Sequence, residues 1–132
     1  MPTPTSDYSK GALLTGRVLS GLAIIFLVFD TAIKFLGRPE VAASMQQLGY
    51  PTELALVIGS IELACLIIYV IPATSVLGAI LFTGYLGGAI ATHLRLENPL
   101  FSHILFPTYI AAFIWGGLYL RDSRVRVLLG QR

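Results

Sequence analysis

Four long apolar stretches constrain this chain more than any other feature of its sequence. They lie at roughly 15–36, 53–71, 75–94 and 103–120 of the 132 residues. At ~1.5 Å of rise per helical residue, each stretch can cross a hydrocarbon core about 30 Å thick. Only 12% of the residues are charged, which is about half the usual fraction in a soluble domain. The sequence therefore predicts an all-α integral membrane protein, built as a four-transmembrane-helix bundle.

The segment between the first two stretches predicts one further helix. Residues 37–51 read GRPEVAASMQQLGYP, with Pro39 where a first helical turn favours proline and Gly49 where a helix stops. Val41, Met45 and Leu48 fall on one face of such a helix. This pattern is typical of a short interfacial helix that lies on the membrane surface.

The positive charges indicate the orientation. With four spans, both tails and the connection at 72–74 share one side, which carries six of the nine lysines and arginines; Lys34, Arg38 and Arg95 lie on the other. Because positive residues favour the cytoplasmic side, we expect both termini in the cytoplasm, beneath a bacterial plasma membrane. The expected parts are a flexible tail at 1–14, a transmembrane domain at 15–122 and a basic tail at 123–132.

Composition argues against several classes of function. The net charge of +2 is small, and no basic run is interleaved with aromatic residues, so nucleic acid is not an expected partner. Cys65 is the sole cysteine, which rules out an intrachain disulfide and predicts a small buried apolar side chain. The first apolar run continues its helical pattern through Asp30 and Lys34, with no small-x-small site directly after it. We therefore expect a span there, not a cleaved signal peptide.

Ionisable residues within the apolar stretches are the first candidates for function, because each costs roughly 2.5–3.5 kcal/mol at the centre of a membrane helix. In the expected orientation they all fall in the outer half of the bundle, and the inner half holds nothing comparable. They are Asp30, Lys34, Glu62, His93, Arg95 and His103.

Helical spacing of 100° per residue predicts which faces meet. Glu62 aligns with Ala55, Gly59, Cys65 and Tyr69, so this face of the second stretch is expected to point inward. In the third stretch, we expect the face with Tyr85 and Thr92 to point inward, and the face with Leu86, Ile90 and Leu94 to meet lipid.

Structural roles explain some of these polar groups equally well. Asp30 and Lys34 are spaced i,i+4 and can pair with each other, while Lys34 and Arg95 can extend to the interface. Glu62 either holds a proton or pairs with a cation from another helix, and that pair would join the helices. His103 suits the interface as well as a site.

Aromatic residues near the span ends predict interfacial belts: Tyr50, Tyr69, Trp115 and Tyr119. Tyr109 differs, because it lies near the depth of Glu62 and its hydroxyl needs a partner. Pro107 is positioned to kink the last span and free a carbonyl.

Three pieces of the chain resemble the DoxX-like membrane proteins. These are FLVFDTAIKF, LGYPTELALVIGSIELACLIIYVIP and GYLGGAIATHLRLENPLFSHILFPTYIAAFIWGGLYLRD, within residues 15–122. The shared features are an aromatic-Asp-Lys end to the first span, Gly59-x-x-Glu62, and a Gly-rich third span closing on Ala-x-His. The resemblance implies a four-helix membrane fold. The family takes its name from a subunit of a thiosulfate:quinone oxidoreductase, and other relatives resemble redox-complex partners or assembly factors.

Two functional hypotheses follow. In the first, an outward-facing pocket handles a small lipophilic or quinone-like molecule by acid–base chemistry. Its catalytic residues would be Glu62, Asp30 and His93. Its ligand-binding residues would be Tyr85, Thr92, Tyr109, Lys34, Arg95 and His103. In the second, the chain is a non-catalytic membrane assembly factor or partner, and the same groups stabilise the bundle.

Other cofactors and partners are less favoured. A quinone suits the first hypothesis, whereas a metal or haem held by His93 and His103 with Glu62 or Asp30 matches no defined ligand spacing. The lipid bilayer and a small lipophilic molecule are the expected partners. Gly84-x-x-x-Gly88 also allows close helix contact, within the chain, with another membrane protein, or with a second copy. A channel or transporter would need such oligomerisation.

Overall fold

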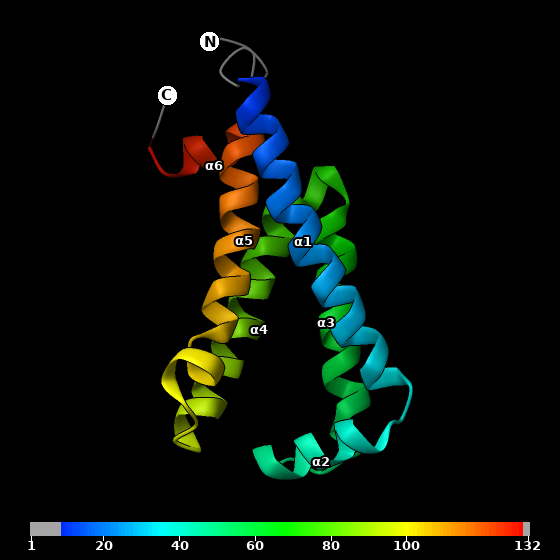
Figure 1. Cartoon of the computed structure of the whole chain (residues 1–132). Helices are drawn as coiled ribbons and strands as arrows, with labels where there is room; N and C mark the ends of the chain where they lie inside the picture. The colour runs from blue at the N-terminus through cyan, green and yellow to red at the C-terminus, as the bar shows by residue number, and fades with distance from the viewer. Residues whose placement is uncertain (1–8, 131–132) are drawn as a thin grey trace.

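Four apolar helices run up and down the molecule: α1 (Lys10–Phe35), α3 (Leu54–Val70), α4 (Ser75–Arg95) and α5 (Phe106–Arg121) (Figure 1). The computed structural model describes residues 9–130, and no strand occurs in that range. Short elements connect or follow the long helices: α2 (Pro39–Leu48), the 3-10 turn η2 (Pro72–Thr74), the π-helical turn η3 (Leu100–Ile104) and α6 (Ser123–Leu128). The all-helical prediction is confirmed.

Local capping sets the ends of α1 and α2. Ser9 accepts a hydrogen bond from the backbone N–H of Ala12 at 3.0 Å, so α1 begins at Lys10. Residues 10–14, which we expected in the flexible tail, are therefore helical; residues 1–8 lie outside the described part. Pro39 occupies the first turn of α2, and Gly49 ends it at φ 80°. The predicted short helix is confirmed, and its place on the membrane surface stays a prediction.

Three helical stretches in the described chain are long and apolar enough to cross a membrane: Lys10–Phe35, Pro72–Arg95 and Leu100–Arg121. The fourth apolar helix, α3, has 17 residues. At 1.5 Å per residue it is about 25 Å long, close to the lower limit for a span. The four-span count therefore stays a prediction.

The long helices form a ring in which α1 packs against α3 and α5, and α4 packs against the same two helices. The start of α1, η2 and α6 lie at one end of the molecule, whereas α2 and η3 lie at the other (Figure 1). Toward that second end, α1 and α3 diverge from α4 and α5, and α2 lies across the opening.

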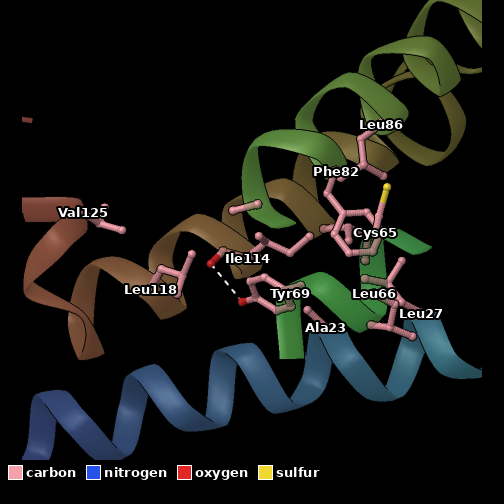
Figure 2. Close-up of a cluster of buried hydrophobic side chains, with 12 residues drawn as sticks. Ala23, Leu27, Cys65, Leu66, Tyr69, Phe82, Leu86, Ile114, Leu118 and Val125 are labelled. Atoms are coloured by element: carbon pink, nitrogen blue, oxygen red, sulfur yellow. Dashed lines mark hydrogen bonds between the residues drawn. The ribbon is translucent and has the colours of Figure 1, made fainter. Parts of the chain in front are cut away.

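Near the first end, the buried core is organised around Tyr69 (Figure 2). Its side chain is 0% exposed. The hydroxyl donates to the backbone oxygen of Ile114 at 3.2 Å and lies 3.0 Å from the hydroxyl of Ser20. Because the Tyr69 hydroxyl uses its only hydrogen in the bond to Ile114, the hydroxyl of Ser20 must be the donor in the bond between Ser20 and Tyr69. The prediction that Tyr69 belongs to an aromatic belt is wrong.

The core also corrects the predicted faces of α4. Leu86 is only 6% exposed and belongs to the same buried cluster as Phe82, Cys65 and Leu27 (Figure 2). We expected Leu86 to meet lipid. In a membrane bundle both the lipid face and the core face are apolar, so the pattern of apolar residues alone does not distinguish them.

Candidate functional site

Glu62 lies midway along α3, and its side chain is 0% exposed. Gly59, one turn earlier, explains how a group from α1 reaches it. A Cβ atom on Gly59 would lie 3.1 Å from Cβ of Lys34, which is tighter than nearly all such contacts. The absent side chain at Gly59 therefore allows α1 to approach, and Lys34 crosses the surface of α3 toward Glu62.

Lys34 bridges two carboxylates. Its ammonium donates to Oδ2 of Asp30 on its own helix and to Oε1 of Glu62 on α3, the latter at 3.0 Å. The side chain of Lys34 is 15% exposed and that of Asp30 is 31% exposed. Both structural expectations, the i,i+4 pair and a cation from another helix for Glu62, are confirmed by this cluster.

The second oxygen of Glu62, Oε2, is buried and accepts no hydrogen bond from any of residues 9–130, although the Tyr85 hydroxyl and the Asp30 carboxyl interact electrostatically with the Glu62 carboxyl group. A buried carboxylate oxygen without a donor loses the hydrogen bonds that water would supply. One ammonium also faces two carboxylates here. The cluster is therefore suited to a ligand that brings a hydrogen-bond donor to Oε2.

A cavity of about 460 Å³ adjoins this cluster, between α1, α3, α4, α5 and α2. Its lining is mainly apolar, with side chains such as Phe26, Ile58 and Ile110. Ligand sites for small molecules are commonly of this size and character, with a few polar groups converging on an apolar space. The polar side chains from the long helices are Asp30, Lys34, Glu62, Tyr85, Thr92 and His93.

The structure thus brings together six of the nine residues named from sequence and places three elsewhere. Arg95 donates to the backbone oxygen of Leu48 at 2.8 Å. The hydroxyl of Tyr109 donates to the backbone oxygen of Phe101 at 2.9 Å, so its partner is not a ligand. The ring of His103 lies outside the lining, with its centroid 5.7 Å from that of His93.

His93 is held by the turn that follows α4. Asn98 Nδ2 lies 2.8 Å from Nδ1 of His93. Because an amide nitrogen donates, Nδ1 accepts, and the neutral ring carries its proton on Nε2.

Among residues 9–130, no group of three or more His, Cys, Asp and Glu side chains is arranged to hold a metal ion.

Helix α2 covers the cavity, a role that sequence reasoning missed. Met45 is buried at 4% exposure, and Val41, Ser44 and Leu48 also line the space. Tyr50 was expected in an aromatic belt, but it lines the cavity and lies 2.9 Å from the hydroxyl of Thr92. The sequence predicted the apolar face of α2, but it did not predict that this face covers the cavity.

Two hydrogen bonds fasten this cover to α4. Arg95 binds the last carbonyl of α2, at Leu48. Since the Thr92 hydroxyl donates to Gly88 at 2.9 Å, Tyr50 must donate to Thr92. At the far end of α2, the hydrogen bonds from Arg38 lower the pKa of the exposed Glu40 carboxyl.

Combining Tyr50→Phe with Arg95→Ala is expected to loosen α2. Each lost hydrogen bond contributes about 1 kcal/mol, so amide exchange over residues 39–48 should rise roughly tenfold or more. Hydrogen–deuterium exchange in detergent measures this. Arg38→Ala, which removes only the exposed pair with Glu40, is the control. If the amides of residues 39–48 exchange equally fast in the double variant and in the control, these two hydrogen bonds do not hold α2 against α4.

Comparison with known protein families identifies the chain. The model of the DoxX-like family matches residues 18–117, so the chain belongs to that family. With its long apolar helices, this membership makes it an integral membrane protein, in contact with the lipid bilayer. No curated protein matches the chain, and no solved structure does.

Proposed function

We propose that this DoxX-like protein binds a small lipophilic molecule bearing a hydroxyl group in the cavity beside Glu62. The unpartnered Oε2 of Glu62 carries the proposal. A ligand hydroxyl donating to Oε2 would complete the hydrogen bonds of the cluster, and the apolar lining would hold the rest of the molecule. Quinols, with two hydroxyl groups on an apolar ring, are one such class.

The same geometry supports acid–base chemistry as the role of the site. A carboxylate that accepts a ligand's hydroxyl hydrogen bond is placed to take and return that proton. Lys34 would stabilise the carboxylate, with Asp30 holding the ammonium in place. His93 Nε2 and the Tyr85 hydroxyl are two further groups of the lining that can orient a ligand oxygen.

We place this site in a four-span bundle. In that arrangement α3 is the short span, and α2 lies at the outer surface above the cavity. The excess of lysine and arginine at the end that holds the start of α1 and α6 supports a cytoplasmic position for that end. The cavity would then open toward the outer side. A subunit of a membrane redox complex is the setting that best suits a quinol ligand.

A short-chain ubiquinol and its matching quinone test the proposal. The quinol can donate to Oε2 and the quinone cannot, so wild-type protein in detergent should bind the quinol roughly tenfold or more tightly, since hydrogen bonds to charged groups contribute about 1.5–3 kcal/mol. In Glu62→Gln, the Lys34 ammonium would donate to the amide oxygen of the glutamine. The amide NH2 group would then take the place of Oε2 and face the cavity. The preference should then vanish or reverse in favour of the quinone.

Isothermal titration under reducing and oxidising conditions measures both affinities. Ser60→Ala is the matched control, because Ser60 lies on the same helix, bonds to Leu56 and is exposed away from the cavity. An unchanged quinol preference in Glu62→Gln would refute the role of Oε2.

A purely structural role is the second candidate, and the Lys34 bridge between α1 and α3 favours it. On that account the chain is an assembly partner, and Glu62→Gln lowers the melting temperature while neither ligand binds the wild type. A stable Glu62→Gln protein with altered ligand preference supports the binding site instead.

A further inference from the structure

A second cavity, of about 310 Å³, lies at the opposite end of the bundle, between the first turns of α1, the end of α3 and the end of α5. Its polar lining consists of Arg17, Arg121, Ser20 and Tyr69. Among residues 9–130, no acidic side chain lines it. The sequence indicated no functional site at this end of the bundle. Arg17 and Arg121 served there only as positive charges that predict the orientation in the membrane.

Arg121 is held in place by a buried chain of hydrogen bonds. Its Nε donates to the Ser20 hydroxyl at 3.0 Å, and its guanidinium carbon lies 5.9 Å from the centre of the Tyr69 ring. The Ser20 hydroxyl donates a hydrogen bond to the Tyr69 hydroxyl, which donates in turn to the backbone oxygen of Ile114. Ser20 and Tyr69 are 3% and 0% exposed. Within the described part of the chain, one of the five guanidinium N–H donors of Arg121 forms a hydrogen bond, which leaves four for a ligand.

Neither arginine forms a direct ion pair with an acidic side chain among the described residues. Arg17 forms no hydrogen bond or ion pair there, and the four ion pairs of the described chain do not include Arg121. The nearest acid in sequence, Asp122, is occupied by Arg124, whose amino group lies 2.6 Å from it. Although partial burial opposes it, the hydrogen bonds from Arg124 hold the pKa of Asp122 below its ordinary value.

We propose that Arg17 and Arg121 bind the phosphate of an anionic phospholipid in this cavity. Guanidinium groups bind phosphate oxygens through paired N–H donors, and the two here form no ion pair among the described residues. Arg121 ends α5, so the site lies at the end of a membrane helix, where lipid phosphates are found. Ile24, about 10 Å along α1 from Arg17, and Val70 supply an apolar wall for an acyl chain.

Native mass spectrometry of the full chain in detergent tests this with three probes: phosphatidylglycerol, phosphatidylcholine and inorganic phosphate. Phosphatidylglycerol should bind in preference to the zwitterionic lipid. Arg17→Gln should reduce its binding roughly tenfold, since each charge-assisted hydrogen bond contributes strongly. The structure gives Arg17 no intramolecular bond, so this variant should fold normally. Arg17→Gln combined with Arg121→Gln should abolish the preference.

Arg38→Gln, which removes a cation at the far end of the molecule, is the control and should bind phosphatidylglycerol as the wild type does. Unchanged binding in Arg17→Gln, or no preference between the two lipids, would overturn the proposal. Displacement of phosphatidylglycerol by equimolar inorganic phosphate would also overturn it, since the free anion would then be the ligand and the acyl chain would contribute nothing.

Discussion

Lys34→Met is expected to lower the free energy of unfolding by about 3–5 kcal/mol, the usual result of removing one partner from a buried ion pair. Methionine keeps an unbranched apolar side chain of nearly the same length but lacks the ammonium group and its charge. Asp30 and the fully buried Glu62 would then share a site with no cation. Because a domain's total stability is only about 5–15 kcal/mol, thermal unfolding in detergent should show a large fall in melting temperature.

A double variant separates the loss of the pair from a loss of packing. Lys34→Met with Glu62→Leu replaces the buried pair with apolar side chains of similar size, which is often neutral for stability. Asp30, being 31% exposed, keeps access to solvent. The double variant should therefore recover most of the lost stability. If it melts as low as Lys34→Met alone, the unpaired carboxylate is not the cause.

Hydropathy predicted the positions of the helices closely. The second stretch was expected at 53–71 and forms α3 at Leu54–Val70; the third was expected at 75–94 and forms α4 at Ser75–Arg95. These limits follow from the strong contrast between apolar stretches and the prolines, glycines and charges between them. The inward face of α3 was also predicted correctly, because Glu62 shows which side avoids lipid.

The candidate site was predicted less completely, for a physical reason. A shared depth in the membrane can be read from sequence, and it grouped Glu62 with Asp30, Lys34 and His93. The direction in which a long side chain turns cannot be read in the same way. Arg95 and Tyr109 share the depth of the site, yet each bonds to a nearby backbone carbonyl.

At the end of the bundle near α6, the polar groups gave no signal in the sequence because each of them is individually ordinary. Ser20 and Tyr69 lie 49 residues apart in sequence, and neither is ionisable at neutral pH in an ordinary setting. Only the crossing of α1, α3 and α5 places them beside Arg121. The pattern of residues along one helix does not predict where that helix crosses another.

Glycines illustrate the same limit. Gly84-x-x-x-Gly88 was the expected motif for close contact, yet a Cβ atom added at either glycine meets nothing within 4 Å. The close approaches lie elsewhere in the described chain. A Cβ on Gly16 would lie 2.8 Å from the backbone oxygen of Gly117, where α1 crosses α5. Any contact of Gly84 and Gly88 with a second chain stays a prediction.

Gly78→Ala is expected to destabilise the bundle by roughly 3 kcal/mol, at the upper end of the usual cost of overpacking. The added Cβ would lie 2.5 Å from the backbone nitrogen of Tyr69 and 2.7 Å from its Cβ. Backbone atoms cannot rotate away, so α3 and α4 must separate. That separation would disturb the contact of Tyr69 with Phe82, whose ring centres are 6.2 Å apart.

Gly84→Ala makes the same chemical change on the same helix and serves as the control. The open space around Gly84 accepts a methyl group, and alanine favours a helix interior over glycine by up to about 1 kcal/mol. Gly84→Ala should therefore match or exceed the wild type in thermal unfolding, while Gly78→Ala melts well below it. Equal melting temperatures would mean that α3 and α4 do not touch at Gly78. Because Tyr69 also holds Ser20 and Arg121, Gly78→Ala should in addition weaken phosphatidylglycerol binding at the proposed lipid site.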